Sequence, residues 1–390
     1  MRPLADYYTG QALADRLVSA LEIREPATAL DLGAGRGALL RALSKRWPTA
    51  ELHAAELDSN GCLTLFKRFP KLKLFQGSGL SDDLFRDLQL DGGSVDVAVC
   101  NPPYLTHEHT QRTNQLLQEA GLGGCLKLKK LSADLLFLAQ NLRLLRRGGE
   151  LGIIVPDTLI AGQEYAPFRD SLMTNHRVFG VIQFPSLAFS GAEALTHALL
   201  IQRGGSTAAE VPLWRSGFDG SLHDEVQVPL NLLSQRMDHG YHAWRMGQPA
   251  LRGTTLAELG AEVKRGSLTH AECRARGLDT FHTGDFGPTG CIRLMKSTMP
   301  PEIVVAEPGD ILIARVGTRC IGRVGRVIAG RAVITDCVYR LRVTKSLIKT
   351  VWQALRSDPG QVWLQANAYG VCARSISKRD LLTFRVTVGI

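Results

Sequence analysis

The sequence predicts an α/β protein, a mostly parallel sheet with crossover helices, followed by a smaller domain rich in short strands. In the first half of the chain, helical patterns alternate with short apolar runs, which is the order that parallel sheets require. In the second half, glycine is more frequent and the apolar runs are short and β-branched. We therefore expect a first domain over residues 1–205, a connecting segment over 206–255 and a second domain over 256–390.

The elements follow from the spacing of apolar residues. A helix is expected over 12–21, where Leu13, Leu17 and Leu21 recur at helical intervals. The other elements expected in the first domain are strands over 27–32, 51–56, 95–100, 151–155, 178–184 and 197–202, and helices over 37–46 and 131–145, the last closed by a basic turn. Those expected in the second domain are strands over 311–316, 323–328 and 339–343 and a helix over 347–356.

Composition excludes several classes of protein. The chain has 390 residues, of which 45% are hydrophobic and 21% charged, so it is neither disordered nor a small domain held together by disulfides. The eight cysteines form no C-x-x-C pair, so we expect reduced thiols and no metal site. The chain start lacks the apolar run of a signal peptide, and no apolar stretch approaches the roughly 18 residues of a membrane span. A cytoplasmic protein without a membrane partner is expected.

The net charge of +9 is unevenly distributed. Residues 1–205 carry 22 basic and 21 acidic side chains, whereas residues 206–390 carry 24 and 16, a net charge of +8. A polyanionic partner is therefore expected for the second half of the chain.

A glycine-rich turn, Asp31-Leu-Gly33-Ala-Gly35-Arg-Gly37, lies between the first expected strand and the next helix. Glycines there let the backbone approach a ligand, and the start of the helix offers amide donors. Glu56 ends the next strand, 19 residues after Gly37, where a carboxylate can accept hydrogen bonds from ribose hydroxyls. The pattern predicts a site for an adenosine-containing ligand, although a dinucleotide or an empty tight turn is also compatible with it.

A second motif, Asn101-Pro102-Pro103-Tyr104, follows the strand expected over 95–100, at the end where open α/β sheets bind ligands. An amine on an aromatic ring is a poor nucleophile because its lone pair is delocalised. The Asn101 side-chain oxygen and the Pro102 carbonyl can accept hydrogen bonds from such an amine and hold its nitrogen in line with a methyl donor. Tyr104 can stack on the ring. We interpret these residues as catalytic; the alternative is a Pro-Pro turn with a surface tyrosine.

The glycine loop with its leading acid resembles the S-adenosylmethionine loop of class I methyltransferases, which are Rossmann-like. Together with the Asn-Pro-Pro-Tyr motif that follows it, the chain resembles the gamma-type amino-methylating DNA methyltransferases. The resemblance implies S-adenosylmethionine as cofactor, with Asp31 near its methionine portion. It extends to residues 137–157, and to Tyr8-Thr9-Gly10-Gln11, similar to the segment that closes over the cofactor.

Two positions of the resemblance concern the cofactor's adenine and the target base. The family commonly has an Asp after the third strand, where this chain has Ser78. We expect Ser78 to bind the cofactor at that position. Phe189 resembles the residue that supplies a second aromatic surface for a flipped base; a core phenylalanine is the alternative. Asn at the first position of the catalytic motif favours adenine over cytosine as the target, by family analogy.

Cys100 precedes the catalytic motif, but we do not assign it a covalent role. Covalent attack on cytosine needs a thiolate after the proline-containing turn, whereas Cys100 falls inside the apolar strand. A buried structural thiol is therefore expected.

The second domain is similar to the target recognition domains of type I restriction specificity subunits. The similarity is carried by Gly309-Asp310-Ile311-Leu312-Ile313-Ala314-Arg315 and by the segment from Tyr369 to Leu381. It occurs once, which implies a short asymmetric target or a homodimer. Arg315 and Arg374 are weak candidates for contacts with DNA.

We expect the chain to methylate the N6 amine of adenine in a specific sequence of double-stranded DNA, after rotating the base out of the stack. A restriction subunit is a candidate partner. Neither a metal nor a covalent intermediate is expected. The alternatives are methylation of ribosomal RNA bases or of a protein glutamine by the same four residues, and a catalytically impaired DNA-binding regulator.

Overall fold

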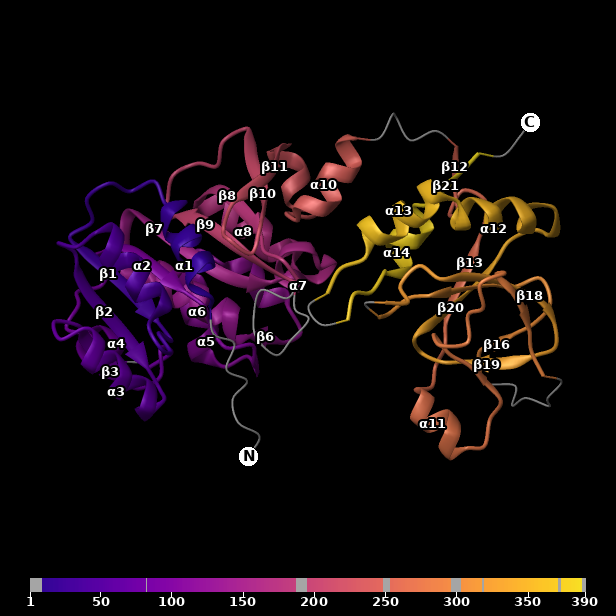
Figure 1. Ribbon diagram of the computed structural model, residues 1–390, viewed down its shortest axis with the longest axis horizontal. Helices are drawn as coiled ribbons and strands as arrows, with labels where there is room; N and C mark the ends of the chain where they lie inside the picture. The colour runs from indigo at the N-terminus through magenta and orange to yellow at the C-terminus, as the bar shows by residue number, and fades with distance from the viewer. Residues whose placement is uncertain are drawn as a thin grey trace. The chain divides into compact units, whose positions relative to one another are not determined.

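The computed structural model describes residues 9–81, 83–186, 195–247, 253–295, 303–317, 319–370 and 373–387. The chain divides into two units, Met1–Ala243 and Trp244–Ile390. Figure 1 shows the first in indigo to magenta and the second in orange to yellow. Each unit has its own buried core, so each is described separately.

Unit 1 is built on a nine-stranded sheet with the order β11-β10-β8-β9-β7-β4-β1-β2-β3. Its strands are β1 (Thr28–Leu32), β2 (Glu51–Glu56), β3 (Lys73–Gln76), β4 (Val95–Cys100), β7 (Leu145–Pro156), β8 (Arg177–Gln183), β9 (Thr196–Gln202), β10 (Glu210–Ser216) and β11 (Leu222–Pro229). β9 and β11 are antiparallel to their neighbours, and the other pairings are parallel. The carboxyl ends of β1, β2, β3, β4 and β7 therefore share one edge.

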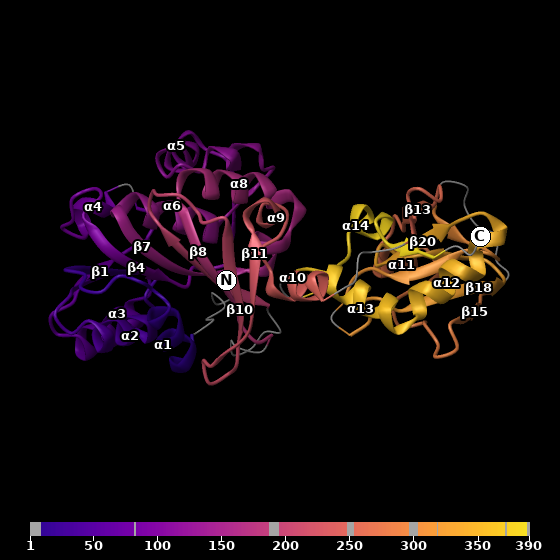
Figure 2. The same ribbon diagram turned by 90° about the horizontal axis from the view of Figure 1, so that it is seen from above.

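Helices cover both faces of this sheet. Figure 2 shows α1, α2 and α3 on one face and α5, α6 and α8 on the other, with each layer enclosing an apolar core. The helices of unit 1 are α1 (Gln11–Ser19), α2 (Ala38–Arg46), α3 (Ser59–Arg68), α4 (Leu84–Asp87), α5 (Gln111–Glu119), α6 (Ala133–Leu144), α7 (Asp157–Ala161), α8 (Ala166–Asn175) and α9 (Leu230–Leu233); α10 (His239–Met246) crosses into unit 2. The strand order changes direction between β1 and β4, and open α/β sheets bind their ligands at the carboxyl edge beside such a switch point.

The expected connecting segment, 206–255, is wrong in its first part. β10 pairs with β8 and β11 pairs with β10, so both strands extend the sheet of unit 1. The chain after them is also fixed there, because the buried guanidinium of Arg169 donates to the carbonyls of Ser234, at 2.9 Å, and Gln235, at 2.6 Å. The boundary between the units thus lies near residue 243 rather than at 205.

A second correction concerns the basic turn expected to close the helix over 131–145. α6 ends at Leu144, and residues 145–149 already belong to β7. Gly149 has no room for a side chain there, since a Cβ would lie 2.9 Å from the Asp96 carbonyl oxygen.

In the part of unit 2 that the structure describes, the strands form three small sheets. The five-stranded sheet has the order β13-β20-β17-β18-β15, and the three-stranded sheet has the order β14-β19-β16. The strands are β12 (Thr254–Thr255), β13 (Glu262–Arg265), β14 (Thr280–Phe281), β15 (Cys291–Arg293), β16 (Val305–Ala306), β17 (Ile311–Ala314), β18 (Val324–Ala329), β19 (Ala332–Ile334), β20 (Val338–Arg342) and β21 (Arg385–Val386). The helices are α11 (His270–Ala275), α12 (Ile348–Arg356), α13 (Asp358–Asn367) and α14 (Lys378–Leu382). The strand-rich second domain is thus observed.

Candidate active site

The glycine-rich turn lies at the carboxyl end of β1. Gly33, Gly35 and Gly37 all have positive φ, and the amide of Gly33 donates to the Ala55 carbonyl at 2.8 Å. At Gly37 the need for glycine is steric as well, because a Cβ would lie 2.7 Å from a methyl carbon of Leu65. The turn is therefore tight and packed against α3, with α2 beginning directly after it.

Glu56 ends β2 and fastens this turn to the start of α3. Its carboxylate accepts hydrogen bonds from the backbone amides of Gly35, at 2.6 Å, and Asp58, at 2.7 Å. These two bonds use part of the acceptor capacity of an ionised carboxylate, which is about four positions. The Glu56 side chain thus positions the loop and retains acceptors for a ligand's hydroxyl groups.

Asp31 is the most unusual group of the site. Its side chain is 1% exposed, and within the described part of the chain neither carboxylate oxygen has a hydrogen-bond partner. Burial, together with the negative charge of Glu56, raises the pKa of this carboxyl well above its usual range. A buried carboxylate without a partner is costly, and a cationic ligand group would relieve that cost. This fits the ammonium of a methionine moiety.

Phe137 is a site residue that the spacing argument did not single out. A Cβ added to Gly79 would lie 2.7 Å from its ring, and one added to Gly33 would lie 3.8 Å away. The ring of Phe137, on α6, is therefore placed between the glycine turn and the loop after β3. Ser78 lies in that loop with an exposed side chain, and its hydroxyl accepts the amide of Leu80 at 3.1 Å.

Asn101 directly follows β4, at the same edge of the sheet. Its side-chain Nδ2 donates to the hydroxyl of Thr9 at 3.1 Å, across 92 residues of sequence. This bond fixes the orientation of the side-chain amide, and the acceptor oxygen Oδ1 is buried. Pro102 is buried, whereas Pro103 and Tyr104 are partly exposed. The predicted catalytic residues and Thr9 are thus brought together.

The chain after the catalytic motif is held against α6. β5 (Thr106–His107) pairs with β6 (Leu131–Ser132), and the amide of Ala133 donates to the Leu105 carbonyl at 2.7 Å. Asp134, in the first turn of α6, is 1% exposed, and burial raises its pKa to about 6. The hairpin-like pairing fixes the loop that contains Tyr104.

Cys100 has the structural role expected of it. Its Sγ is fully buried and donates to the Leu32 carbonyl at 2.9 Å. Burial, with a further contribution from the charge of Asp31, raises the pKa of the thiol well above its usual range. A protonated, bonded thiol cannot serve as a nucleophile.

Two predicted site residues, Tyr8 and Phe189, lie outside the described residues. The others are placed at one edge of the sheet: Asp31 and Glu56 lie at the carboxyl ends of β1 and β2, the rest lie in the loops after β1, β3 and β4, and Thr9 lies next to Asn101. Parallel strands account for this convergence, because their carboxyl ends meet there.

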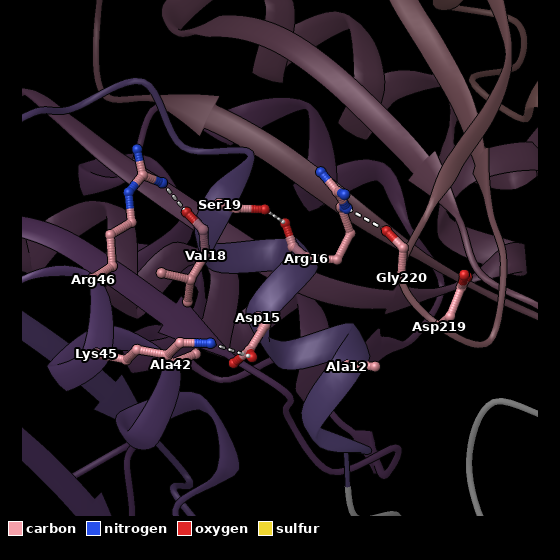
Figure 3. A pocket seen from close by; sticks show the side chains of 10 residues that line it. All are labelled: Ala12, Asp15, Arg16, Val18, Ser19, Ala42, Lys45, Arg46, Asp219 and Gly220. Carbon is pink, nitrogen blue, oxygen red and sulfur yellow. Dashed lines mark hydrogen bonds and ion pairs between the residues drawn. The ribbon is translucent and has the colours of Figure 1, made fainter.

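A cavity of about 470 Å³ lies elsewhere in unit 1, between α1, α2 and the turn from β10 to β11 (Figure 3). Its polar groups are largely bonded to one another: Lys45 Nζ lies 3.3 Å from Asp15 Oδ2, and Arg16 donates to the Gly220 carbonyl. Arg46 donates to carbonyl groups at the end of α1. The residues lining this cavity include none of the predicted site residues.

Membrane-spanning helices and metal clusters are both absent from the described residues. None of the helices there is both long enough and apolar enough to cross a bilayer. In the same ranges, His, Cys, Asp and Glu side chains form no group of three or more suited to holding a metal ion.

Comparison with protein families finds a match over residues 51–189 to the Eco57I restriction-modification methylase family. Among curated proteins, the chain is 27% identical over 164 residues to a release factor glutamine methyltransferase from Rhodopirellula baltica, covering 41% of this chain and 54% of that protein. The chain thus spans about half the length of the relative it matches.

Two solved structures are also similar. The type IIG restriction endonuclease BpuSI is 13% identical, with a TM-score of 0.50 over 97% of this chain and 57% of that one. The type I restriction-modification methyltransferase subunit from Streptococcus thermophilus is 17% identical, with a TM-score of 0.45 over 62% and 52% of the two chains. The sheet topology and the similarity to BpuSI confirm the predicted fold class: the first unit has the α/β fold of class I S-adenosylmethionine-dependent methyltransferases.

Proposed function

We propose that the chain transfers a methyl group from S-adenosylmethionine to the N6 amine of adenine in a specific sequence of duplex DNA. The observation that carries the proposal is the fixed Asn101 amide, held by Thr9 at the carboxyl end of β4, beside the glycine turn. The match of residues 51–189 to a restriction-modification methylase family supports DNA as the substrate. The same match supports a role in restriction-modification or defence.

The residues at the edge of the sheet fit this cofactor. The carboxylate of Asp31 would pair with its methionine ammonium, and Glu56 would accept its ribose hydroxyls while still holding Gly35. Gly33 leaves room for it, because an added Cβ would meet only the Phe137 ring, at 3.8 Å. Phe137, with Ser78 nearby, would border its adenine. When bound, S-adenosylmethionine supplies an electrophilic methyl group. Thr9, and Tyr8 by resemblance, would close over it.

The catalytic residues act on the amine of the target base. Asn101 Oδ1 and the Pro102 carbonyl accept hydrogen bonds from its two N–H groups, and this keeps the nitrogen lone pair directed at the methyl carbon. Pro103 keeps the turn rigid, and Tyr104 stacks on the base. Bound S-adenosylmethionine would give up its methyl group by cleavage of the bond from sulfur to the methyl carbon and would leave as S-adenosylhomocysteine. The positive charge that develops on the amine nitrogen would lie against these two oxygens until the nitrogen releases a proton to solvent.

Duplex DNA is the proposed partner because of the charge of unit 2. With the boundary at residue 243, the first unit carries 24 basic and 26 acidic side chains, and the second carries 22 and 11, a net charge of +11. Contacts with phosphates would offset the cost of rotating the target base out of the stack, roughly a few kcal/mol. A homodimer, or a separate restriction subunit, would supply any second half-site.

A second candidate function is methylation of a protein glutamine, which the 27% identity to a release factor glutamine methyltransferase favours. A glutamine side-chain amide is planar and offers two N–H bonds, so Asn101 and Pro102 could hold it in the same way. A base in ribosomal RNA is chemically equivalent. The charge of unit 2 is the feature that favours DNA over protein.

The test uses the purified full chain with tritium-labelled methyl S-adenosylmethionine and three substrates: genomic DNA, total RNA and a protein extract. The DNA is digested to nucleosides and the label identified by chromatography. The proposal predicts label in N6-methyladenine. Label only in N4-methylcytosine would contradict the choice of base, and label only in RNA or protein would contradict the choice of DNA.

A further inference from the structure

The five-stranded sheet of unit 2 has two ends that differ in charge. At one end β13 finishes at Arg265, β17 finishes before Arg315, and β18 begins after Arg323. The register pairs Arg265 with Tyr339 and Ala314 with Val338, so these strand ends lie together. We call this end, with Arg265, Arg315, Arg323 and Asp336, the arginine edge.

At the opposite end of the sheet, Arg342 and Arg331 are both paired with acids. Arg342 donates to Asp310 at 2.5 Å and also to Glu307, and these bonds raise the pKa of its guanidinium. Arg331 lies 3.4 Å from Glu307. This end is therefore neutralised internally, whereas at the arginine edge the carboxylate of Asp336 is paired with Arg265.

Of the two exposed arginines at the arginine edge, Arg265 and Arg323, Arg265 has the more defined orientation. Its Nε donates to the backbone carbonyl of Asp336 at 3.0 Å, and one terminal nitrogen donates to Oδ2 of Asp336, also at 3.0 Å. A guanidinium has five N–H donors, and these bonds use two of them. The remaining three face no partner among the described residues, and the side chain is 52% exposed. Asp336 thus presents a fixed guanidinium to the outside.

Arg315 and Arg374, the candidates from sequence, are used internally instead. Arg315 donates to the Asp336 carbonyl at 2.9 Å, and its guanidinium carbon lies 5.5 Å from the ring centre of Tyr339. Arg374 donates to the Ala368 carbonyl at 2.7 Å. Both guanidinium groups hold backbone segments in place, so the structure favours Arg265 over either of them as a contact with DNA.

Two histidine rings lie beside Asp336. His270 and His282 stack with their ring centres 4.6 Å apart, and His282 Nδ1 is 2.8 Å from the hydroxyl of Thr335. Burial, with a smaller contribution from His270, lowers the pKa of His282. The surface next to Arg265 therefore includes two stacked flat rings with hydrogen-bonding nitrogens. Arg323, on the other side, is exposed and bonded to none of the described residues through its side chain.

We propose that Arg265, oriented by Asp336, determines specificity by donating two parallel hydrogen bonds to the O6 and N7 of a guanine in the target sequence. Arginine matches that pair of acceptors better than any other side chain does. Arg323, which has no such orienting partner, neutralises a DNA phosphate. This inference rests on the proposed function in taking DNA as the ligand of unit 2, but it does not require that methyl transfer occurs.

The experiment selects bound duplexes from a random-sequence DNA pool with the full chain, in the presence of a non-reactive cofactor analogue. The variants are Arg265→Lys and Arg265→Gln, and the matched control is Arg331→Lys, because Arg331 is also half-exposed and paired with a carboxylate but lies at the opposite end of the sheet. Thermal unfolding of each variant checks that it is folded.

The wild-type chain is expected to enrich one motif that contains a guanine. Both Arg265 variants should lose about 5- to 150-fold of the preference for guanine at one position while keeping the other positions. Arg331→Lys should select the wild-type motif. The proposal is overturned if folded Arg265 variants select the unchanged motif, if they weaken all positions equally, or if the wild-type chain enriches nothing. Because selection reads binding alone, failure of the methylation assay leaves this result interpretable.

Discussion

The two units of the chain differ in where their charged groups lie. Unit 1 has a net charge of −2 and buries the carboxylate of Asp31 without a hydrogen-bond partner among the described residues. Unit 2 has a net charge of +11 and presents arginines at an exposed end of a sheet. The difference teaches that catalysis and DNA binding have opposite requirements. Catalysis needs a few fixed groups shielded from water, whereas DNA binding needs many exposed cations.

The boundary near residue 243 makes this contrast sharper than a boundary at 205 does. Residues 206–243 contain five acidic and two basic side chains, so assigning them to the second domain hides part of its charge. They belong to unit 1 because β10 and β11 extend its sheet.

The largest effect is expected for Asn101→Ala. Loss of the fixed acceptor should lower the methylation rate by about 10²- to 10³-fold, measured as transfer of labelled methyl to DNA. Binding of S-adenosylmethionine, measured by calorimetry, should change little, because Asn101 faces the target amine. Cys100→Ala is the control next to it and should retain most of the activity. A wild-type rate for Asn101→Ala would contradict the assigned role.

Asp31→Asn should separate binding from stability. Removing the carboxylate should weaken S-adenosylmethionine binding by about 10- to 100-fold, since a charge-assisted bond is lost. The raised pKa of Asp31 means that the folded chain holds this proton more tightly than the unfolded chain does. Without cofactor, the folded chain therefore loses stability as pH rises from the unfolded pKa of Asp31 toward its folded pKa.

The melting temperature of the cofactor-free Asp31→Asn protein should accordingly exceed that of the wild type at pH 8. The difference should vanish on acidification below the pKa of Asp31 in the unfolded chain. A variant that is less stable than the wild type at pH 8 would show that the carboxylate has a stabilising partner.

Gly37→Ala tests the geometry of the glycine turn. The positive φ and the 2.7 Å approach to Leu65 should together cost about 1–3 kcal/mol of unfolding free energy, measured by urea denaturation. Gly277→Ala is a control with φ of +61° and no heavy atom within 4 Å of the added Cβ, so it isolates the cost of the backbone conformation. Equal losses for the two variants would remove the steric part of the explanation.

Arg323→Ala should have the smallest effect. Loss of one phosphate contact should reduce the slope of log affinity against log salt by about one, without changing the selected motif. Arg331→Ala should leave the slope closer to the wild-type value, because its charge is already paired with Glu307. Identical slopes for wild-type and Arg323→Ala proteins would place Arg323 outside the DNA interface.

Local patterns sufficed for much of the fold. The strands expected over 51–56 and 95–100 have those bounds, and the second is an apolar run that Asn101 and two prolines end. β10 was missed although Val211 and Leu213 alternate in it and are buried, because Pro212 between them weakens a strand pattern. β11 was missed because it is the edge strand of the sheet, and Val228 is its fully buried residue. An exposed strand lacks the apolar pattern that reveals the others.

The parts of the candidate site that lie in sequence motifs could be predicted, whereas contacts between residues far apart in the sequence could not. The glycine turn, Glu56 and Asn101 follow from spacing and from the ends of parallel strands. The bond from Asn101 to Thr9 spans 92 residues and the pair of Arg265 with Asp336 spans 71, and no local pattern announces either.

The central claim is tested most directly by sequencing that reports modified bases in DNA from cells expressing the chain, in a host that lacks adenine methylation. We predict N6-methyladenine at nearly all copies of one motif, and none when the expressed chain carries Asn101→Ala. Methylated cytosine alone, methylation scattered without a motif, or unmodified DNA from cells with abundant folded protein would contradict the account.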